Sequence, residues 1–414
     1  ALGLLRPDFS EIDHIAWATT LTLAFALLAV TVAAALGLVL APFYRLRPVR
    51  WVCVALRSVH ELFWALIFMQ VFGLGVTTGL LAIGLPYVGI FAKVYAEYLD
   101  ATDPGPRAVL PPKTSALSAF LFARLPLAAR EIATYWLYRI ECGIRSSAVL
   151  GFVGLPTLGF QLDTFFKQGR YGAVAAILLI YFAVIASIRL WLRRRLLLVW
   201  LAAAVVALAR VESPPMGGNS LVRFLTHDVV PKPLRDGDLA DLATWARFAR
   251  WLADIVTGPA AAGVVATLIV AQLALVLTGL VAVLAYPAIV RGVVGRTGAL
   301  IGHIGLVVVR SSPEYMLAYV FLQILGPSML PLVLALALHN GAIIGHLLGR
   351  QASGIAGALR PDAPRGFDLW AWELTPRLTL SFLALCLYRW EIILRESAIV
   401  GLLVLYRFFP EVGA

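Results

Sequence analysis

The sequence predicts an all-α integral membrane protein with about ten transmembrane helices in two parallel tandem repeats. The first observation behind this prediction is composition, because 61% of the 414 residues are hydrophobic and only 14% are charged. Soluble proteins contain about 45–50% apolar residues. The second is a series of apolar runs, since a helix needs ~20 apolar residues to cross a hydrocarbon core of about 30 Å. The third is a charged motif that occurs twice.

The first copy of this motif places three charges inside an otherwise apolar segment. It covers Tyr138–Gly151, with the sequence YRIECGIRSSAVLG, and returns 250 residues later as Tyr388–Gly401, with the sequence YRWEIILRESAIVG. Tyr, Arg, Glu, Arg, Ser, Ala and Gly keep their spacing in both copies. A second pair of segments, Arg57–Glu61 and Arg310–Glu314, lies 253 residues apart. We therefore expect a tandem duplication, and we call Tyr138–Gly151 and Tyr388–Gly401 the motif segments.

The first repeat is predicted to cover residues 1–195. Its apolar runs, each predicted to be a transmembrane helix, are residues 14–43, 51–72, 76–98, 127–155 and 172–192. A basic, proline-bearing stretch over 101–125 separates the third run from the fourth. Arginines follow the first run and cluster at 189–195, and such arginines mark the cytoplasmic side of a membrane protein.

A connecting region over 196–258 leads into the second repeat, 259–414. It is predicted to consist of a short span, 196–209, and an external segment, 210–254. The runs of the second repeat are 259–290, 300–325, 328–349 and 378–405, with a basic loop over 350–377. Because the short span restores the starting side, the repeats are expected to be parallel rather than inverted. The second repeat is expected to lack its last helix, and the sequence is expected to be short at both ends.

Arginine asymmetry also predicts which segments face each side of the membrane. The segments expected on the cytoplasmic side are 44–50, 101–125, 189–195, 291–299 and 350–377. The segments expected outside are 157–171 and 210–254. The net charge of +11 follows from these cytoplasmic arginines, so we expect contact with the lipid bilayer and none with nucleic acid.

Cofactor and metal sites are not expected in this chain. The three cysteines stand alone in apolar segments, and the histidines show no carboxylate at a metal-ligand spacing, so packed or surface histidines are the better interpretation. Lys113 and Thr114 resemble the end of a nucleotide-binding loop, but Pro112 occupies the place of the required glycine. We therefore expect this chain not to bind ATP, and the lack of a nucleophile or catalytic group argues against an enzyme.

Over most of both halves, the chain resembles the permease subunit of phosphonate-type ABC importers. The resemblance is carried by Arg57–Leu66, the Gly-Leu-Gly turn at 73–75, the Asp-Pro-Gly at 103–105 and the two motif segments. It implies the fold of a type I ABC importer permease, with two permease copies fused in one chain. The implied solute is phosphonate, phosphite or a related phosphorus oxyanion, taken up across the bacterial inner membrane.

The resemblance also implies the partners. Two ATP-binding cassette subunits, which bind ATP and Mg, would dock on loops 101–125 and 350–377, and an external phosphonate- or phosphite-binding protein would deliver the solute. The implied coupling-loop residues are Glu97, Asp103, Gly105, Lys113, Leu125, Pro126, Arg350, Arg360 and Pro376. The two loops differ in sequence, since Leu125-Pro126 becomes Leu374-Thr375-Pro376 in the second repeat, so we expect them to hold the ATPase unequally.

The charged residues of the motif segments have two interpretations. A charge at the bilayer centre costs about 2.5–3.5 kcal/mol on insertion scales, so these residues need partners or water. One interpretation is an i,i+4 pair that locks the helix, and the other is an arginine-lined oxyanion path. The substrate-path candidates are Arg139, Glu141, Arg145, Ser146, Arg389, Glu391, Arg395 and Ser397. The expected helix-locking pairs are Arg57 with Glu61 and Arg310 with Glu314.

Two further alternatives stay open at the level of sequence. The glycine-rich segment 151–159 is either an unwound substrate-binding segment or a helix end. The function is either that of an ABC permease for another small solute or that of an ion-coupled secondary transporter. A secondary transporter would be expected to show inverted repeats and a midplane coupling carboxylate, whereas each motif glutamate here stands beside arginines.

Overall fold

The computed structural model describes the backbone of residues 6–10, 12–103, 105, 109–111, 113–212, 219–326, 328–360 and 362–408. No strand occurs in these ranges, which consist of helices joined by turns. The chain divides into two compact units, Ala1–Val230 and Pro231–Ala414. The boundary between them lies inside the connecting region predicted over 196–258.

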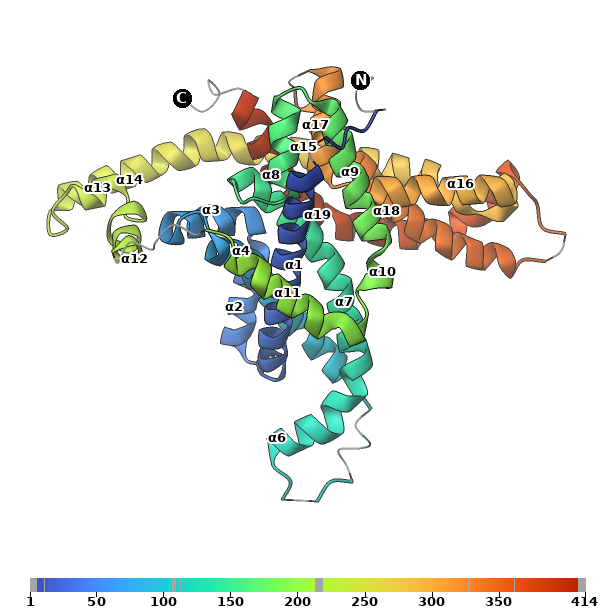
Figure 1. Ribbon diagram of the computed structural model, residues 1–414, viewed down its shortest axis with the longest axis horizontal. Helices are drawn as coiled ribbons and strands as arrows, with labels where there is room; N and C mark the ends of the chain where they lie inside the picture. The colour runs from blue at the N-terminus through green and yellow to red at the C-terminus, as the bar shows by residue number, and fades with distance from the viewer. Residues whose placement is uncertain are drawn as a thin grey trace. The chain divides into compact units, whose positions relative to one another are not determined.

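The first unit is built around α4, which packs against α1, α2, α3 and α7 (Figure 1). Its elements are, in order, α1 (Ile12–Leu40), η2 (Ala41–Phe43), α2 (Arg47–Ser58), α3 (Glu61–Phe72), α4 (Val76–Asp100), α6 (Ala116–Ala119), η3 (Phe120–Arg124), α7 (Leu125–Val149), η4 (Leu150–Val153), α8 (Leu158–Lys167), α9 (Tyr171–Ala186), α10 (Ile188–Trp191), η5 (Arg194–Leu196), α11 (Leu197–Ala209), α12 (Ser220–Arg223) and η6 (Phe224–Asp228). The first motif segment begins on α7, which also packs directly against α1.

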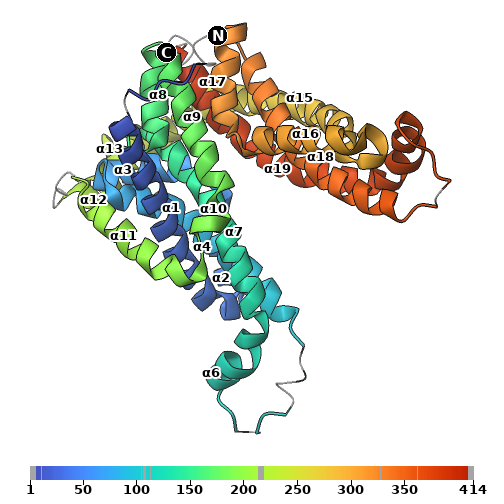
Figure 2. The same ribbon diagram turned by 45° about the vertical axis from the view of Figure 1, so that its right-hand side comes forward.

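The second unit is built in the same way around α18, which packs against α15, α16, α17 and α19 (Figure 2). Its elements are α13 (Lys232–Arg235), α14 (Leu242–Ile255), η7 (Val256–Ala260), α15 (Ala261–Ala285), η8 (Tyr286–Ile289), α16 (Arg291–Ser311), α17 (Glu314–Leu325), α18 (Leu330–Gly357), η9 (Leu369–Leu374) and α19 (Thr375–Phe408). The second motif segment lies on α19.

The two units share an order of elements and a packing pattern. Helices α1, α2, α3, α4 and α7 of the first unit correspond to α15, α16, α17, α18 and α19 of the second. A glycine with positive φ ends the third helix of each series, Gly73 at 71° after α3 and Gly326 at 76° after α17. Only glycine adopts this backbone conformation readily. A glycine therefore ends the third helix at the same point of both units.

Five helical stretches in the described ranges are long and apolar enough to cross a membrane, or up to seven if each bent pair counts as one span. The five are His14–Phe43, Val76–Asp100, Leu242–Ile289, Arg291–Ser311 and Leu330–Gly357. The runs predicted over 172–192 and 196–209 contain α9 and α11, of 16 and 13 residues. Both are shorter than the ~20 residues that a span requires, because an apolar run also includes turn residues.

The stretch predicted as external, 210–254, is partly helical and joined to the following span. Helix α14 continues through η7 into α15 and η8, so that Leu242–Ile289 forms 48 residues of helix. The last thirteen residues of this stretch, 242–254, are therefore helical and continuous with the following span, and the side of the membrane on which they lie stays a prediction. Pro259 lies in η7, a wide helical turn, and such turns accommodate proline without ending the helix.

The run predicted as one span over 51–72 is broken. Helices α2 and α3 meet at a bend of 93°, because Val59 and His60 adopt extended backbone angles and His60 Nδ1 accepts a hydrogen bond of 3.2 Å from Leu62 N. Arg57 and Glu61 therefore lie on separate helices. The i,i+4 geometry predicted for a helix-locking pair does not apply to them.

The second expected locking pair is separated in the same way. Arg310 lies near the end of α16 and Glu314 begins α17, with Ser312 and Pro313 extended between them. Pro313 has a fixed φ and no N–H to continue the helix. The break is again invisible in the apolar pattern, which continues on both sides.

The two predicted coupling loops are shorter than expected. In the first, α6 and η3 already extend over 116–124, directly before α7. In the second, α18 continues to Gly357, so Arg350 lies on a helix and not in a loop. Pro126 and Pro376 each come just after a wide helical turn, η3 and η9 respectively, and such turns accommodate proline without ending the helix.

Candidate functional site

The charged residues of the first motif segment lie on one helix, α7, and point in two directions. Arg145 Nη2 lies 3.8 Å from Glu141 Oε1, and both side chains are about one-third exposed or less, at 27% and 31%. This is the contact expected of residues one turn apart. Arg139 is not on this face, because residues six apart differ by roughly 120° around a helix.

Arg139 instead faces α4, and its guanidinium meets one aromatic ring of α4 and one of its own helix. Its guanidinium carbon lies 4.4 Å from the centroid of the Tyr87 ring and 6.0 Å from that of Tyr135. The Tyr87 hydroxyl lies 3.3 Å from Ser146 Oγ, and both residues are buried. Residues 139 and 146 are two turns apart and share a face of α7. We call Tyr87, Tyr135, Arg139 and Ser146 the Tyr87 cluster.

The second unit holds a polar cluster between α18 and α19. Arg389 Nη1 donates to Asn340 Oδ1 at 3.4 Å, and Asn340 Nδ2 donates to Glu396 Oε2 at 3.3 Å and to Leu336 O at 3.0 Å. Asn340 is completely buried. Its amide therefore connects a guanidinium to a carboxylate, and a buried amide is stabilised when both its oxygen and its nitrogen are bonded in this way. We call Asn340, Arg389 and Glu396 the Asn340 cluster.

The residues of these two clusters are separated by the same spacings as the repeated segments of the sequence. Tyr87 and Asn340 are 253 residues apart, the spacing of Arg57 and Arg310. Arg139 and Arg389, like Ser146 and Glu396, are 250 apart, the spacing of the motif segments. The arginine is thus common to both units, while its two neighbours change from tyrosine and serine to asparagine and glutamate. Arg139 faces uncharged groups, whereas Arg389 is linked to a carboxylate.

A buried histidine lies beside the Asn340 cluster. His339 Nδ1 is 2.7 Å from Ser312 O, and its Nε2 is 3.7 Å from Glu314 Oε2. A carbonyl oxygen only accepts hydrogen bonds, so Nδ1 carries a proton. His339 is only 2% exposed, which agrees with the interpretation of this residue as a packed histidine.

The other serines and carboxylates of the motif segments have different surroundings. Ser397 is buried and donates to Leu394 O at 3.0 Å, just as Ser147 donates to Ile144 O at 2.9 Å. Ser147 also contacts Thr22 O on α1 at 2.8 Å. Glu391 is exposed. Ser397 thus corresponds to Ser147 in the structure, and the counterpart of Ser146 is Glu396.

The glycine-rich segment after the first motif is a tightly packed turn between α7 and α8. Gly154 has a φ of 107°, and the helices on either side meet at a bend of 48°. A Cβ on Gly159 would overlap the carbonyl oxygen of Ala148, and one on Gly151 would overlap the backbone of Gly159 and Phe160. Leu158 N donates to Thr22 Oγ1 at 2.9 Å. Backbone therefore packs on backbone here, in a region with little exposed surface.

The first coupling loop is anchored by an acidic residue that the sequence analysis did not single out. Asp100 Oδ1 accepts from Arg45 Nη2 at 3.0 Å and from Arg124 Nη2 at 2.7 Å. Arg124 also donates to Leu99 O through Nε and Nη2. Asp100 thus ties the end of α4 to η3 and to the turn after η2, although its exposure limits what each pair contributes to about 1 kcal/mol.

The remaining predicted coupling residues are close to the surface. Glu97 Oε1 lies 3.6 Å from Lys93 Nζ on α4, Asp103 Oδ1 accepts from Gly105 N at 2.9 Å, and Lys113 is exposed. In the second unit, Arg360 Nε lies 3.9 Å from Asp362 Oδ1.

Four residues of these contacts were not predicted from the sequence: Tyr87, Asn340, Glu396 and Asp100. The motif alignment carries a signal for Glu396, because a carboxylate replaces Ser146 next to an aligned arginine. The spacing of 253 residues gives a similar signal for Asn340. This polar residue stands in an apolar run, 253 residues after Tyr87.

Comparison with known proteins shows that the chain is similar in sequence to transport permeases. The chain is 36% identical over 135 residues to the phosphite transport system permease protein PtxC of Stutzerimonas stutzeri, covering 32% of this chain and 49% of that protein. It is 33% identical over 135 residues to the phosphate-import permease protein PhnE of Mycolicibacterium smegmatis, covering 32% of this chain and 25% of that protein. It is also 31% identical over 84 residues to a putative cryptic phosphonate transport system permease protein of Escherichia coli, covering 20% of this chain and 69% of that protein. The chain belongs to the phosphonate-type ABC transport permease family.

Membership of the phosphonate-type permeases confirms the family resemblance, and together with the apolar helices it confirms a multi-pass membrane protein. The relatives are named as transport permeases and not as enzymes. The matched stretches span about half of the Stutzerimonas relative and a quarter of the Mycolicibacterium relative. No family model matches the chain. No solved structure matches it either.

Proposed function

We propose that this phosphonate-type permease is the membrane-spanning subunit of an ATP-driven importer for phosphonate, phosphite or a related phosphorus oxyanion. The observation that carries this proposal is Arg139, a guanidinium held within a helical unit by two uncharged rings, those of Tyr87 and Tyr135. Its charge is not cancelled inside the Tyr87 cluster, and a guanidinium suits the oxygens of a phosphorus oxyanion. The names of the relatives, which refer to phosphite, phosphate and phosphonate transport, support the same solute class.

We propose further that the chain is a tandem duplication with parallel repeats. The shared order of elements, the shared packing around α4 and α18, and the glycines that end α3 and α17 support this. Each repeat is a counterpart of one permease copy. The substrate-path residues are those of the two motif segments, with Tyr87, Asn340 and Glu396 added as their immediate partners.

In this proposal the chain lies in the bacterial inner membrane, and the energy for transport comes from partner subunits on the cytoplasmic side. One ATP-binding cassette subunit docks on each of the loops 101–125 and 350–377, and an external binding protein supplies the solute. ATP and Mg are held by the cassette subunits. Closure of those subunits moves the attached helices as rigid bodies. Asp100 supports this role for the first loop, because it fastens the loop to two other segments of its unit.

Replacing residues 105–115 by a Gly/Ser linker of equal length is expected to uncouple ATP hydrolysis from uptake. The linker leaves α4, η3 and α7 intact but removes the side chains with which this loop would contact the ATPase subunit. Uptake of labelled phosphite and ATPase activity would be measured in the same membranes, with the membrane level of the chain as a control. Unchanged uptake with normal coupling would contradict the role of this loop.

Cysteine labelling tests the proposed sidedness. In a variant without native cysteines, a membrane-impermeant maleimide is expected to react with Arg235→Cys from outside and with Leu110→Cys only after permeabilisation. The reason is the arginine distribution, which places 101–125 on the cytoplasmic side and 210–254 outside. The opposite pattern of labelling would refute the topology.

A further inference from the structure

The second unit contains a basic cavity that is separate from the motif segments. Its volume is about 1190 Å³, and it is lined by residues of η8, the beginning of α16, the last turns of α18, the following loop and η9. Its arginines are Arg291, Arg296, Arg350, Arg360 and Arg365, with Ser353 among them. We call this cavity the arginine pocket. Among the described residues that line it, none belongs to the Asn340 cluster or to Tyr388–Gly401.

The charge of the arginine pocket is of one sign. Five of its lining residues are arginines, and no aspartate or glutamate occurs among the described residues that line it. Arg360 has an ion pair with Asp362 at 3.9 Å, but Asp362 is outside the lining and both side chains are largely exposed. Like charges gathered in one cavity repel each other, and an anion relieves that repulsion.

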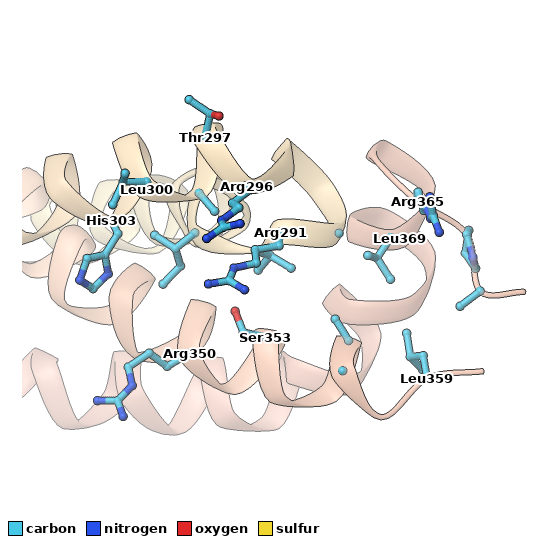
Figure 3. A pocket seen from close by; sticks show the side chains of 18 of the residues that line it. Arg291, Arg296, Thr297, Leu300, His303, Arg350, Ser353, Leu359, Arg365 and Leu369 are labelled. Carbon is cyan, nitrogen blue, oxygen red and sulfur yellow. The ribbon is translucent and has the colours of Figure 1, made fainter. Parts of the chain in front are cut away.

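A break in α16 directs two of the arginines into the pocket. Gly295 has φ 74° and ψ 179°, which interrupts the helix between Arg291 and Arg296. In an unbroken helix, residues five apart would point roughly 140° away from each other. In this structure, both guanidinium groups extend into the same space, on the side where Ser353 lies (Figure 3). Only glycine adopts such angles at low cost.

Two segments that line the pocket, the beginning of α16 and the loop after α18, are joined to each other and to the apolar core. Gly366 N donates to Gly292 O at 3.0 Å and joins the loop after α18 to the beginning of α16. Val290 and Leu369, both almost fully buried, belong to one apolar cluster with α18 and α19 beneath this junction. The backbone that carries Arg291 is therefore fastened to a packed core, while the arginine side chains themselves are exposed and open to a ligand.

We propose that the arginine pocket binds a phosphate-class group. Guanidinium groups form paired hydrogen bonds with phosphate oxygens, and basic pockets beside membrane helices on the cytoplasmic side are suited to anionic lipid headgroups. The segments 291–299 and 350–377 are the ones that arginine asymmetry assigns to the cytoplasmic side. The phosphate group comes either from an anionic phospholipid or from a free phosphorus oxyanion.

Two binding measurements on the purified full chain separate these sources. In neutral detergent without lipid, equilibrium dialysis with labelled inorganic phosphate measures binding of the free anion. After incubation with mixed phosphatidylcholine and phosphatidylglycerol, native mass spectrometry measures retained phosphatidylglycerol. The pocket variant is Arg291→Gln with Arg296→Gln, and the matched control is Arg47→Gln with Arg50→Gln, two exposed arginines of α2.

The expected result is that the pocket variant binds at least one probe about tenfold or more weakly, because each charge-assisted hydrogen bond contributes strongly to affinity. The control variant is expected to bind like the unmodified chain. Loss of phosphatidylglycerol alone identifies a lipid site, and loss of phosphate binding identifies a free-anion site. A second variant, Arg350→Gln, tests the pocket from α18 in case the first variant does not fold.

Equal binding of both probes by the unmodified chain and by the two pocket variants would overturn the proposal. Binding of neither probe by the unmodified chain would also overturn the proposal. The arginines would then be assigned to ion pairs with acidic groups of the ATPase. Neither measurement involves uptake, so this outcome is distinguishable from a failure of the proposed transport function.

Discussion

Replacing Arg139 by Gln is expected to reduce phosphite uptake far more than the double replacement Arg389→Gln with Glu396→Gln. Arg139 lies over the rings of Tyr87 and Tyr135, which carry no charge, so its removal takes away a whole positive charge. The double replacement removes one positive and one negative group, linked through Asn340. A charge-assisted hydrogen bond contributes about 1.5–3 kcal/mol, so uptake by the Arg139 variant should fall roughly ten- to a hundredfold.

This comparison requires uptake at equal membrane levels, with ATPase activity of the assembled transporter as a second readout. Arg139→Lys keeps the charge but loses the planar fork, and is expected to hydrolyse ATP while taking up phosphite poorly. The paired change Glu141→Gln with Arg145→Gln removes the i,i+4 pair and serves as the helix-locking control. Normal uptake by both Arg139 variants would contradict the substrate-path interpretation. The interpretation in which the motif charges only lock the helix would then remain.

Replacing Gly159 by Ala is expected to prevent stable folding of the first unit. The added methyl group would overlap the carbonyl oxygen of Ala148, and this contact joins two backbones, so no flexible side chain can move away. Overpacking typically costs about 1–3 kcal/mol, and a clash with backbone belongs at the upper end. The yield of monodisperse chain after detergent extraction, and its thermal midpoint, would be measured.

Gly263→Ala on α15 provides the matched control. A Cβ at Gly263 would meet nothing within 4 Å, and its backbone φ is not in the left-handed region. An alanine there is expected to be neutral or slightly stabilising, because alanine loses less entropy than glycine in a helix. Equal stability of the Gly159 and Gly263 variants would show that the turn between α7 and α8 tolerates a side chain.

The sequence predicted the long helices well because their signal is local. An apolar run of span length identifies α1, α4, α15 and α18 without reference to the rest of the chain. The same signal failed between α2 and α3, where hydrophobic residues continue across Val59 and His60 although the backbone turns there.

For the candidate site, the sequence predicted which charges share a helix but not what they face. The Glu141–Arg145 contact depends only on helical spacing. The partners Tyr87 and Asn340 lie on other helices, about fifty residues away in sequence, so they follow from packing rather than from local pattern. Glu396 was visible in the repeated motif, but its importance depends on its contact with Asn340.

The difference between the Tyr87 and Asn340 clusters has an evolutionary consequence. A homodimeric permease encodes each position once, so every substitution appears in both subunits and two-fold symmetry is retained. In the proposed duplication, Tyr87 and Asn340 are encoded separately and can diverge. A change that strengthens anion attraction in one half can be balanced by a carboxylate such as Glu396 in the other. The single chain can therefore specialise its halves, which no symmetric assembly of identical subunits can do.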